Sequence, residues 1–428
     1  MIVPRPLRRN HPRFEGGALA GIATLLLLTA TPSLADDGDD AIHGRVELQD
    51  AGNFVRGNTL DAQFGGENRN DFLSDIRLTW EPSWNNWSLA VHYVVDTDYG
   101  DDIALARDEA GLLPLPPATW FNLTNTFDNS GEFEGSQRID RLSVAYTASD
   151  FVVRVGRQAL TWGSGLVFRP MDLFDPFSPT ATDTEYKPGT DMLYTQWLFG
   201  DGSDLQFIVV PRPDRLGAQP ASDDSSEALH YHGTILGHAT TLLLARDHGD
   251  WVAGLGVNGA LGGATWNVEL VPTFLRTGGT RASSLANISD AVTFLDRNTT
   301  VFAEYFHNGF GDNESDLTFA TLPPDLVDRL SRGQLFNVRS DYLATGLTME
   351  INPLLNAGPT LIADLDDQSV YALFQATYSL EDNLTLVGGA QAPIGPSGSE
   401  FGGLRLAPTG KIFLGSPSQL YLQIRRYF

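Results

Sequence analysis

The chain has 428 residues, no cysteine and a formal net charge of -25. Such an acidic excess excludes nucleic acid as a partner, because nucleic-acid binding requires basic surface. Without cysteine the fold cannot rely on disulfides.

The first 35 residues have the pattern of a secretory signal peptide. Four arginines precede an apolar stretch over residues 17–30, and residues 33–35 (Ser-Leu-Ala) fit a small-x-small cleavage site. The apolar stretch is shorter than the roughly 20 residues that a spanning helix needs. The remaining chain, residues 36–428, holds 24 basic and 52 acidic residues, a net charge of -28, and is expected to form one domain.

Alternation of apolar and polar residues begins weakly over residues 41–50 and is clear over 72–81. A period of two predicts strands with one apolar and one polar face. The pattern returns over residues 87–95 after a short turn, with aromatic residues near that turn, as expected where strands cross a membrane interface. The long acidic stretch 98–136 is then predicted to be an exposed loop.

Short turns and long loops continue to alternate along the rest of the chain. Membrane barrels connect their strands in this way, with short turns on one side and long loops on the other. The sequence therefore predicts an all-β fold, a closed antiparallel transmembrane β-barrel of about 18 strands, with 16 as an alternative count. A soluble β-sheet protein or a propeller is the rival fold, but no repeat typical of propeller blades is present. The further predicted strands are 142–146, 151–158, 192–199, 205–210, 228–235, 240–245, 251–261, 264–274, 284–295, 300–308, 342–351, 359–363, 370–378, 384–391 and 419–428.

The stretch over residues 151–179 begins as a strand and then loses its alternation, yet it keeps many large apolar residues. These side chains would be costly as an exposed patch and favourable when buried against a wall. Prolines provide turns that let the chain fold back. We therefore predict that residues 159–190 turn into the barrel lumen and narrow it; a loop packed over the outer rim is the alternative.

Alternation also predicts which side chains line the lumen. A barrel of roughly 16–18 strands encloses water, and charges on its wall bias which ions pass. Arg154 and Gln158 are expected to hydrogen-bond loop carbonyls or Asp172. The alternative is that the wall charges pair with each other and have no selective role. The predicted lining and constriction residues are Arg77, Arg141, Arg154, Gln158, Trp162, Phe168, Asp172, Phe174, Asp175, Glu269 and Glu304.

Three segments resemble known sequences. The last strand, ending in Phe428, resembles the C-terminal strand by which the barrel-assembly machinery recognises Gram-negative outer-membrane barrels, although Arg426 stands where those proteins usually have an aromatic residue. The segments GRQ…TWGSGLVFRPMDLFDP (156–176) and EYFHNGFG (304–311) resemble motifs of proteobacterial porin-like barrels of poorly defined function. The resemblance implies an outer-membrane location, contact with lipids and lipopolysaccharide, and small solutes as ligands; a homo-oligomer is compatible with it.

We expect a channel for diffusion of small solutes and no enzyme. An export or lipid-transfer barrel acting with a periplasmic partner, and a membrane-embedded hydrolase, stay open as alternatives. Asp172 and Asp175 are not expected to be catalytic, and His230 and His232 lack a third metal ligand. Gly163-Ser164-Gly165 does not have the spacing of a nucleophile elbow, and no phosphate-binding loop is present, so no cofactor is expected.

Overall fold

The structure is a computed structural model that describes residues 41–108, 119–213 and 221–428. The predicted signal peptide, residues 1–35, lies outside the described residues. Among the residues that the structure describes, no helix is both long enough and apolar enough to cross a membrane.

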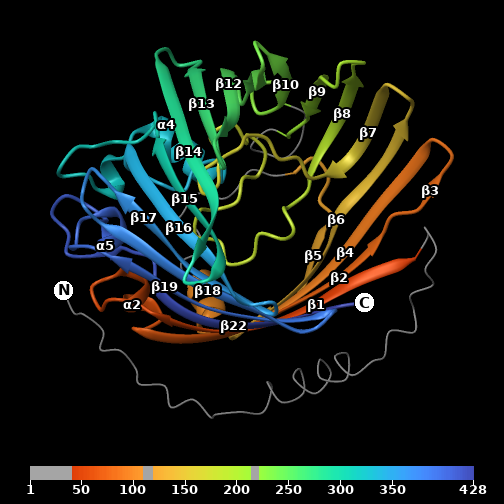
Figure 1. Cartoon of the computed structure of the whole chain (residues 1–428). Helices are drawn as coiled ribbons and strands as arrows, with labels where there is room; N and C mark the ends of the chain where they lie inside the picture. Colours follow the sequence, from red (N-terminus) through yellow and green to blue (C-terminus); the bar gives the residue numbers. More distant parts are fainter. Residues whose placement is uncertain (1–40, 109–118, 214–220) are drawn as a thin grey trace.

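Eighteen antiparallel strands form a closed ring, as the sequence predicted (Figure 1). Each strand pairs with its neighbour in the chain, and β1 closes the ring by pairing with β22, from Arg45 opposite Tyr427 to Phe54 opposite Ser418. Closure leaves no unpaired sheet edge, the requirement for a sheet surrounded by lipid. The ring strands are β1 (Ile42–Phe54), β2 (Asn68–Trp80), β4 (Trp87–Gly100), β6 (Phe133–Thr147), β7 (Phe151–Gln158), β8 (Thr190–Leu198), β9 (Asp204–Val210), β10 (Ser226–Ile235), β11 (His238–Asp247), β12 (Asp250–Leu261), β13 (Ala264–Phe274), β14 (Thr280–Phe294), β15 (Arg297–His307), β16 (Asp341–Asn352), β17 (Leu355–Asp364), β18 (Val370–Glu381), β19 (Leu384–Ile394) and β22 (Ser418–Tyr427).

Short strands and helices lie in the connections between ring strands. Two further strands extend the sheet, because β3 pairs with β4 and β5 pairs with β6, while β20 and β21 form a separate two-stranded sheet. In the part of the chain that the structure describes, four short helices and one 3-10 helix lie in the long connections. These elements are β3 (Ser83–Trp84), β5 (Thr124–Ser130), β20 (Leu404–Arg405), β21 (Phe413–Leu414), α2 (Leu60–Phe64), α3 (Asp101–Asp108), α4 (Pro324–Ser331), α5 (Glu400–Gly403) and η1 (Phe319–Thr321).

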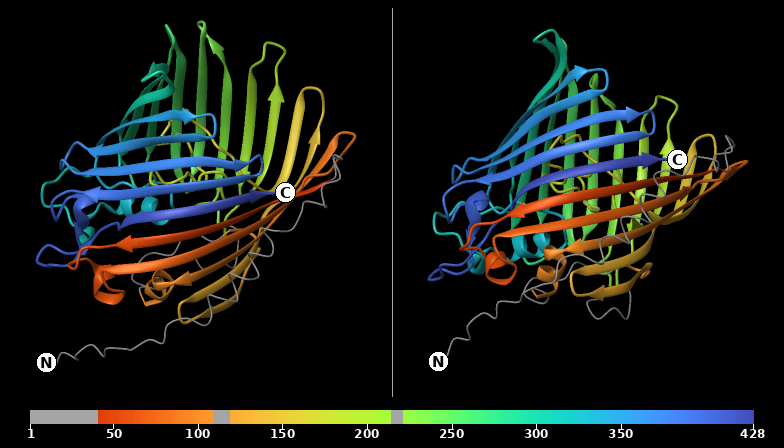
Figure 2. Two further views of the ribbon diagram at one scale, coloured as in Figure 1. Left: turned by 60° about the horizontal axis from the view of Figure 1, so that its bottom comes forward. Right: turned by 90° about the horizontal axis from the view of Figure 1, so that it is seen from below.

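The two ends of the barrel differ in their connections. The end that holds the C-terminus has only short turns, such as residues 236–237 and 262–263 (Figure 2). We call it the turn end. The opposite end, the loop end, carries the long connections 308–340 and 395–417, although the two-residue turn 248–249 also lies there. The sequence predicted this sorting of connections.

The wall alternates as a membrane barrel does. Large apolar side chains on the outside recur at every second residue, for example Leu242 and Leu244 of β11, which are 41% and 51% exposed, whereas Leu243 between them is 4% exposed. Two of the side chains that alternation places on the outside, Leu78 and Val144, are likewise exposed. An apolar exterior of this kind suits contact with lipid.

Residues 159–189, which we call the infolded loop, lie inside the ring (Figure 1). Trp162, Met171, Leu173 and Phe174 are buried in an apolar cluster with strands β8 to β13, and Phe168 is buried in a second cluster with β14 to β18. Fully burying one such side chain contributes roughly 1.5–3 kcal/mol. The predicted infolding is therefore confirmed, although Phe177, predicted to be buried with them, is only half-buried.

Candidate functional site

A carboxylate on the barrel wall holds the first turn of the infolded loop. Glu304 on β15 is fully buried and accepts hydrogen bonds from the backbone N–H groups of Leu166, Val167 and Phe168 at 2.6, 2.9 and 2.8 Å. Asn287 on β14 donates to Glu304 at 2.9 Å. Three consecutive N–H groups form a concave site suited to an anion, and here the protein's own carboxylate fills it.

A second carboxylate on the barrel wall also binds the backbone of the infolded loop. Glu269 on β13 accepts a hydrogen bond from the backbone N–H of Ser164 at 2.5 Å and is 1% exposed. Gly163 has a positive φ of 86°, and a Cβ there would lie 3.2 Å from Glu269 Oε1 and from Met171 Cβ. Only glycine adopts that backbone without strain, so Gly163 allows the loop to approach the wall this closely.

Lys187, near the end of the infolded loop, binds both the middle and the beginning of the loop. Lys187 Nζ donates to both carboxylate oxygens of Asp172 at 2.7 Å and to the carbonyl oxygen of Leu160. Arg154 and Gln158 were expected to hydrogen-bond loop carbonyls or Asp172, and Gln158 does neither. Gln158 Nε2 instead donates to backbone carbonyls within 3.5 Å, including that of Met192. The Arg154 guanidinium lies 5.9 Å from the ring centre of Tyr194.

The wall beside this pair is also charged and fully paired. A β-bulge in the β4–β6 pairing leaves Asp140 without a partner residue on β4, so that the consecutive residues Asp140 and Arg141 are both largely buried. Asp140 accepts hydrogen bonds from Arg77 at 2.7 Å and Arg141 at 2.9 Å. Arg141 also donates to the carbonyl oxygen of Lys187. Arg77 and Arg141 thus support the loop.

The second half of the infolded loop is tied to the strands that close the barrel. Arg45 on β1 donates to Asp183 at 3.0 Å and to Glu185 at 2.9 Å. Tyr427 on β22 also donates to Glu185, at 2.9 Å. Gln391 on β19 donates to the carbonyl oxygen of Thr180 at 3.1 Å. The loop is therefore attached to opposite sides of the ring and divides the lumen.

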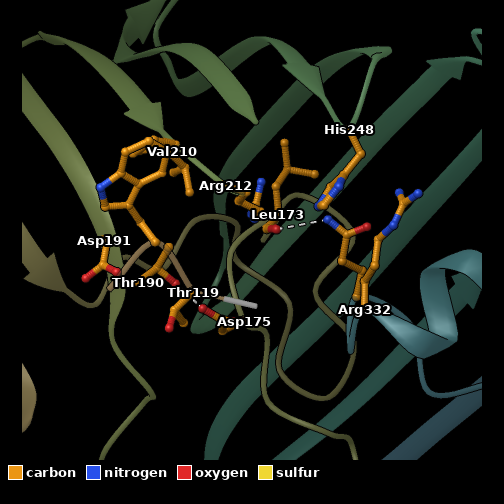
Figure 3. A pocket seen from close by; sticks show the side chains of 12 residues that line it. Thr119, Leu173, Asp175, Thr190, Asp191, Val210, Arg212, His248 and Arg332 are labelled. Atoms are coloured by element: carbon orange, nitrogen blue, oxygen red, sulfur yellow. Dashed lines mark hydrogen bonds between the residues drawn. The ribbon is translucent and has the colours of Figure 1, made fainter. Parts of the chain in front are cut away.

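On one side of the infolded loop, next to β4–β9, side chains fill the lumen midway between the two ends of the barrel. A cavity of about 290 Å³ near the turn end is lined by Arg141, Arg154 and Gln158. Near the loop end lies a cavity of only about 50 Å³, with Asp191 and Thr190 on one side and His248 and Arg332 on the other (Figure 3). Burial and the neighbouring arginines lower the pKa of His248.

Ion pairs occupy the layer between these two cavities. Arg157 pairs with Asp191 at 2.8 Å, and a Cβ on Gly189 would meet both Arg157 and Arg141. Lys187 and Asp172 pack beside them. Because each of these charges is buried and partnered, a solute crossing here would have to break several ion pairs. We call this the closed side.

Two larger cavities lie on the other side of the infolded loop, next to β14–β19. The inner cavity, about 480 Å³, opens toward the turn end and includes Thr360 and Leu373. The outer cavity, about 370 Å³, opens toward the loop end and includes Ile362 and Tyr371. Both are lined by residues 178–179. We call this the open side.

The two cavities are separated by a single layer of side chains. Thr360 and Ile362 are two residues apart on β17, and Leu373 and Tyr371 are two apart on β18, so the cavities lie about 7 Å apart along the strands. Gln391 lies in this layer, where Tyr371 donates to it at 2.8 Å and Gln391 donates to Thr180. One hydrogen bond between wall and loop therefore crosses the layer between the two cavities.

Glu400 in α5 lines the outer cavity and is half-buried. It accepts hydrogen bonds from Asn337 at 3.0 Å, from Tyr342 at 2.5 Å and from the backbone N–H of Arg339 at 3.1 Å. Burial raises the pKa of Glu400 to about 7, although these hydrogen bonds act in the opposite direction. The charge of the outer cavity therefore changes near neutral pH.

The remaining predicted site residues pack against the wall of the closed side. Trp162 donates to Gln206 at 3.0 Å and stacks on His230 at 4.7 Å, in contact with Phe174. Asp175 accepts from Thr190 and has a positive φ of 52°. The structure thus places Trp162, Phe174 and Asp175 away from the two open-side cavities; a constricting role for them stays a prediction.

The sequence analysis did not identify Gln391, which lies between the two open-side cavities, or Lys187, the cation that holds the loop. Gln391 alternates like any wall residue, and nothing in its neighbourhood distinguishes it. The sequence does mark Lys187 as unusual, because it is one of only two lysines in the chain and lies in a loop rich in proline and phenylalanine.

No protein-family model and no curated protein matches this sequence. Solved structures do match. Pseudomonas aeruginosa OccK9 (OpdG) superposes with a TM-score of 0.51 at 11% identity over 90% of this chain and 97% of that one. Pseudomonas aeruginosa OccK5 (OpdH) has a TM-score of 0.51 at 8% identity over 90% and 98%. At such identities the likeness concerns the fold: the chain has the closed antiparallel barrel of the porin type.

Proposed function

We propose that this protein is an outer-membrane channel through which small solutes diffuse along the open side of the lumen. The observation that carries the proposal is the pair of cavities that enter from opposite ends, share residues 178–179 in their lining and are separated by one layer of side chains. Their volumes, about 480 and 370 Å³, fall within the roughly 300–1,000 Å³ typical of small-molecule sites. The exterior of alternating apolar side chains supports a location in the membrane.

The same geometry favours a channel over the two alternatives. The buried carboxylates of the lumen wall, Glu269 and Glu304, accept hydrogen bonds from the infolded loop, so they serve as anchors and are not free to act as catalytic groups. A lipid-transfer barrel would need an apolar path, whereas the inner cavity presents hydroxyl groups from Thr300, Thr348 and Thr360.

Electrical recording tests the proposal. The refolded mature chain should give stepwise conductance in a planar bilayer with potassium chloride on both sides. Gln391→Ala removes the side chain that bridges wall and loop, so its conductance should be larger. Gln196→Ala, the same change on β8 of the closed side, should match the wild type. A correctly folded barrel that produces no conductance steps would contradict the proposed function.

A further inference from the structure

Resting on the proposed function, we infer that the open side selects uncharged solutes rich in hydroxyl or amide groups, of about monosaccharide size, over carboxylates of the same size. Neutral hydrogen-bonding side chains from five neighbouring strands line the inner cavity. They are Ser289, Thr300, Thr348, Thr360, Gln375 and Thr377. A hydroxyl or amide of a solute exchanges hydrogen bonds with water for hydrogen bonds with these groups, at little net change in free energy.

The inner cavity has one charged lining residue, Arg169, among the residues that the structure describes. Its guanidinium carbon lies 5.6 Å from the ring centre of Phe177. Other lumen cations lie elsewhere, and two of them are paired, Arg45 with Asp183 and Arg77 with Asp140. A carboxylate that enters therefore meets a single cation, and any hydration that it loses there is costly for a charged group.

The outer cavity gives anions no compensating attraction. Its charged lining residues are Asp61 and Glu400. Asp61 already pairs with Arg69 at 3.2 Å. The chain as a whole carries a net charge of -25, which lowers the local concentration of anions at the entrance. Charge therefore acts against carboxylates at both stages of the path.

Apolar faces complete the inner cavity. Phe177 from the loop, Phe302 from β15 and Leu373 from β18 contribute to its lining. Small-molecule sites commonly combine such apolar surface with a few polar groups that orient the ligand. A ring with hydroxyl groups on its edge and C–H groups on its faces matches both kinds of surface, whereas a small inorganic ion matches neither.

Three probes of equal size and different charge test the inference: glucose, glucuronate and glucosamine. Uptake of each is measured in liposomes that contain the full mature chain, with potassium on both sides and valinomycin to hold the membrane potential at zero. We expect glucose to enter several-fold faster than glucuronate. Entry of glucuronate at the rate of glucose or faster, in liposomes that conduct potassium chloride, overturns the inference while leaving the channel function intact.

A matched pair of variants locates the selection. Ser289→Asp places a carboxylate in the inner cavity of the open side, and Ser88→Asp places one in the cavity of the closed side. Ser289→Asp should slow the entry of glucose and favour glucosamine over glucose, because the ammonium group of glucosamine gains an anionic partner. Ser88→Asp should leave both rates unchanged. Equal effects of the two variants would overturn the assignment of the path to the open side.

Discussion

Lys187 Nζ lies 2.7 Å from both carboxylate oxygens of Asp172, so one buried ion pair joins the middle and the end of the infolded loop. The side chains of Lys187 and Asp172 are 6% and 1% exposed. A long connection inside a barrel loses much conformational entropy when it is ordered. The ion pair links two parts of the loop and so limits the conformations open to it. The wall contacts then have less conformational entropy to offset.

Lys187→Met should destabilise the barrel by about 3–5 kcal/mol, because it leaves the Asp172 carboxylate buried without a partner. The double variant Lys187→Met with Asp172→Leu should regain most of that loss, since no charge is left unpaired. Urea unfolding in lipid vesicles measures both. A single variant as stable as the wild type would show that the pair does not hold the loop.

Glu304→Gln should loosen the loop where it meets β15. An amide oxygen is a weaker acceptor than a carboxylate for the N–H groups of Leu166, Val167 and Phe168. We expect a loss of roughly 2–3 kcal/mol and noisier open-channel current. Glu350→Gln on β16, which removes the charge of a half-buried residue that accepts an exposed hydrogen bond from Asn298, is the control and should change neither quantity. Identical noise in the two variants would argue against the anchor.

Gly256 on β12 leaves room for the loop residue Met171. A Cβ on Gly256 would lie 3.3 Å from Met171 Cε. Gly256→Leu should therefore overpack the lumen and cost about 1–3 kcal/mol. Adding Met171→Ala should recover part of that loss, because it vacates the same space. If thermal or urea unfolding shows that the two effects simply add, the two residues are not in contact.

The pH dependence should follow Glu400, whose pKa burial raises to about 7. A carboxyl with a higher pKa in the folded than in the unfolded chain stabilises the fold most at low pH, and this contribution is lost as pH rises through 7. The stability difference between wild type and Glu400→Gln should therefore shift against the wild type between pH 5 and 8, by about 3 kcal/mol at most. Over the same range the wild-type channel should become more cation-selective.

The Glu400→Gln channel provides the comparison for that titration. Its ratio of potassium to chloride permeability, measured from the reversal potential in a salt gradient, should stay constant across this range. A variant that titrates like the wild type would assign the pH dependence to another group.

The barrel was predictable because its strands obey a local rule. Alternation over residues such as 72–81 marks each strand, and one closed ring satisfies all of them. The infolding of residues 159–189 was predictable from large apolar residues in a segment broken by prolines. Its attachments were not, because they join distant parts of the chain: Glu304 and Leu166 are 138 residues apart, and Gln391 and Thr180 are 211 apart. No local pattern encodes such pairs.

Alternation gives no indication of local irregularities in a strand. Asp140 and Arg141 are consecutive yet both largely buried, because a bulge interrupts the period of two. Gln158 bonds to backbone carbonyls near its own strand, so it does not reach Asp172. Irregular backbone of this kind depends on which strands become neighbours, and strand neighbours are defined only once the ring has formed.

The most direct test of the open-side path uses a single introduced thiol. The chain contains no cysteine, so a charged methanethiosulfonate reagent reacts only where one is placed. Thr360→Cys lies in the inner cavity of the open side and Ser88→Cys in the cavity of the closed side. Modification should reduce single-channel conductance strongly in Thr360→Cys and little in Ser88→Cys. A channel blocked through Ser88→Cys and unaffected through Thr360→Cys would contradict the account.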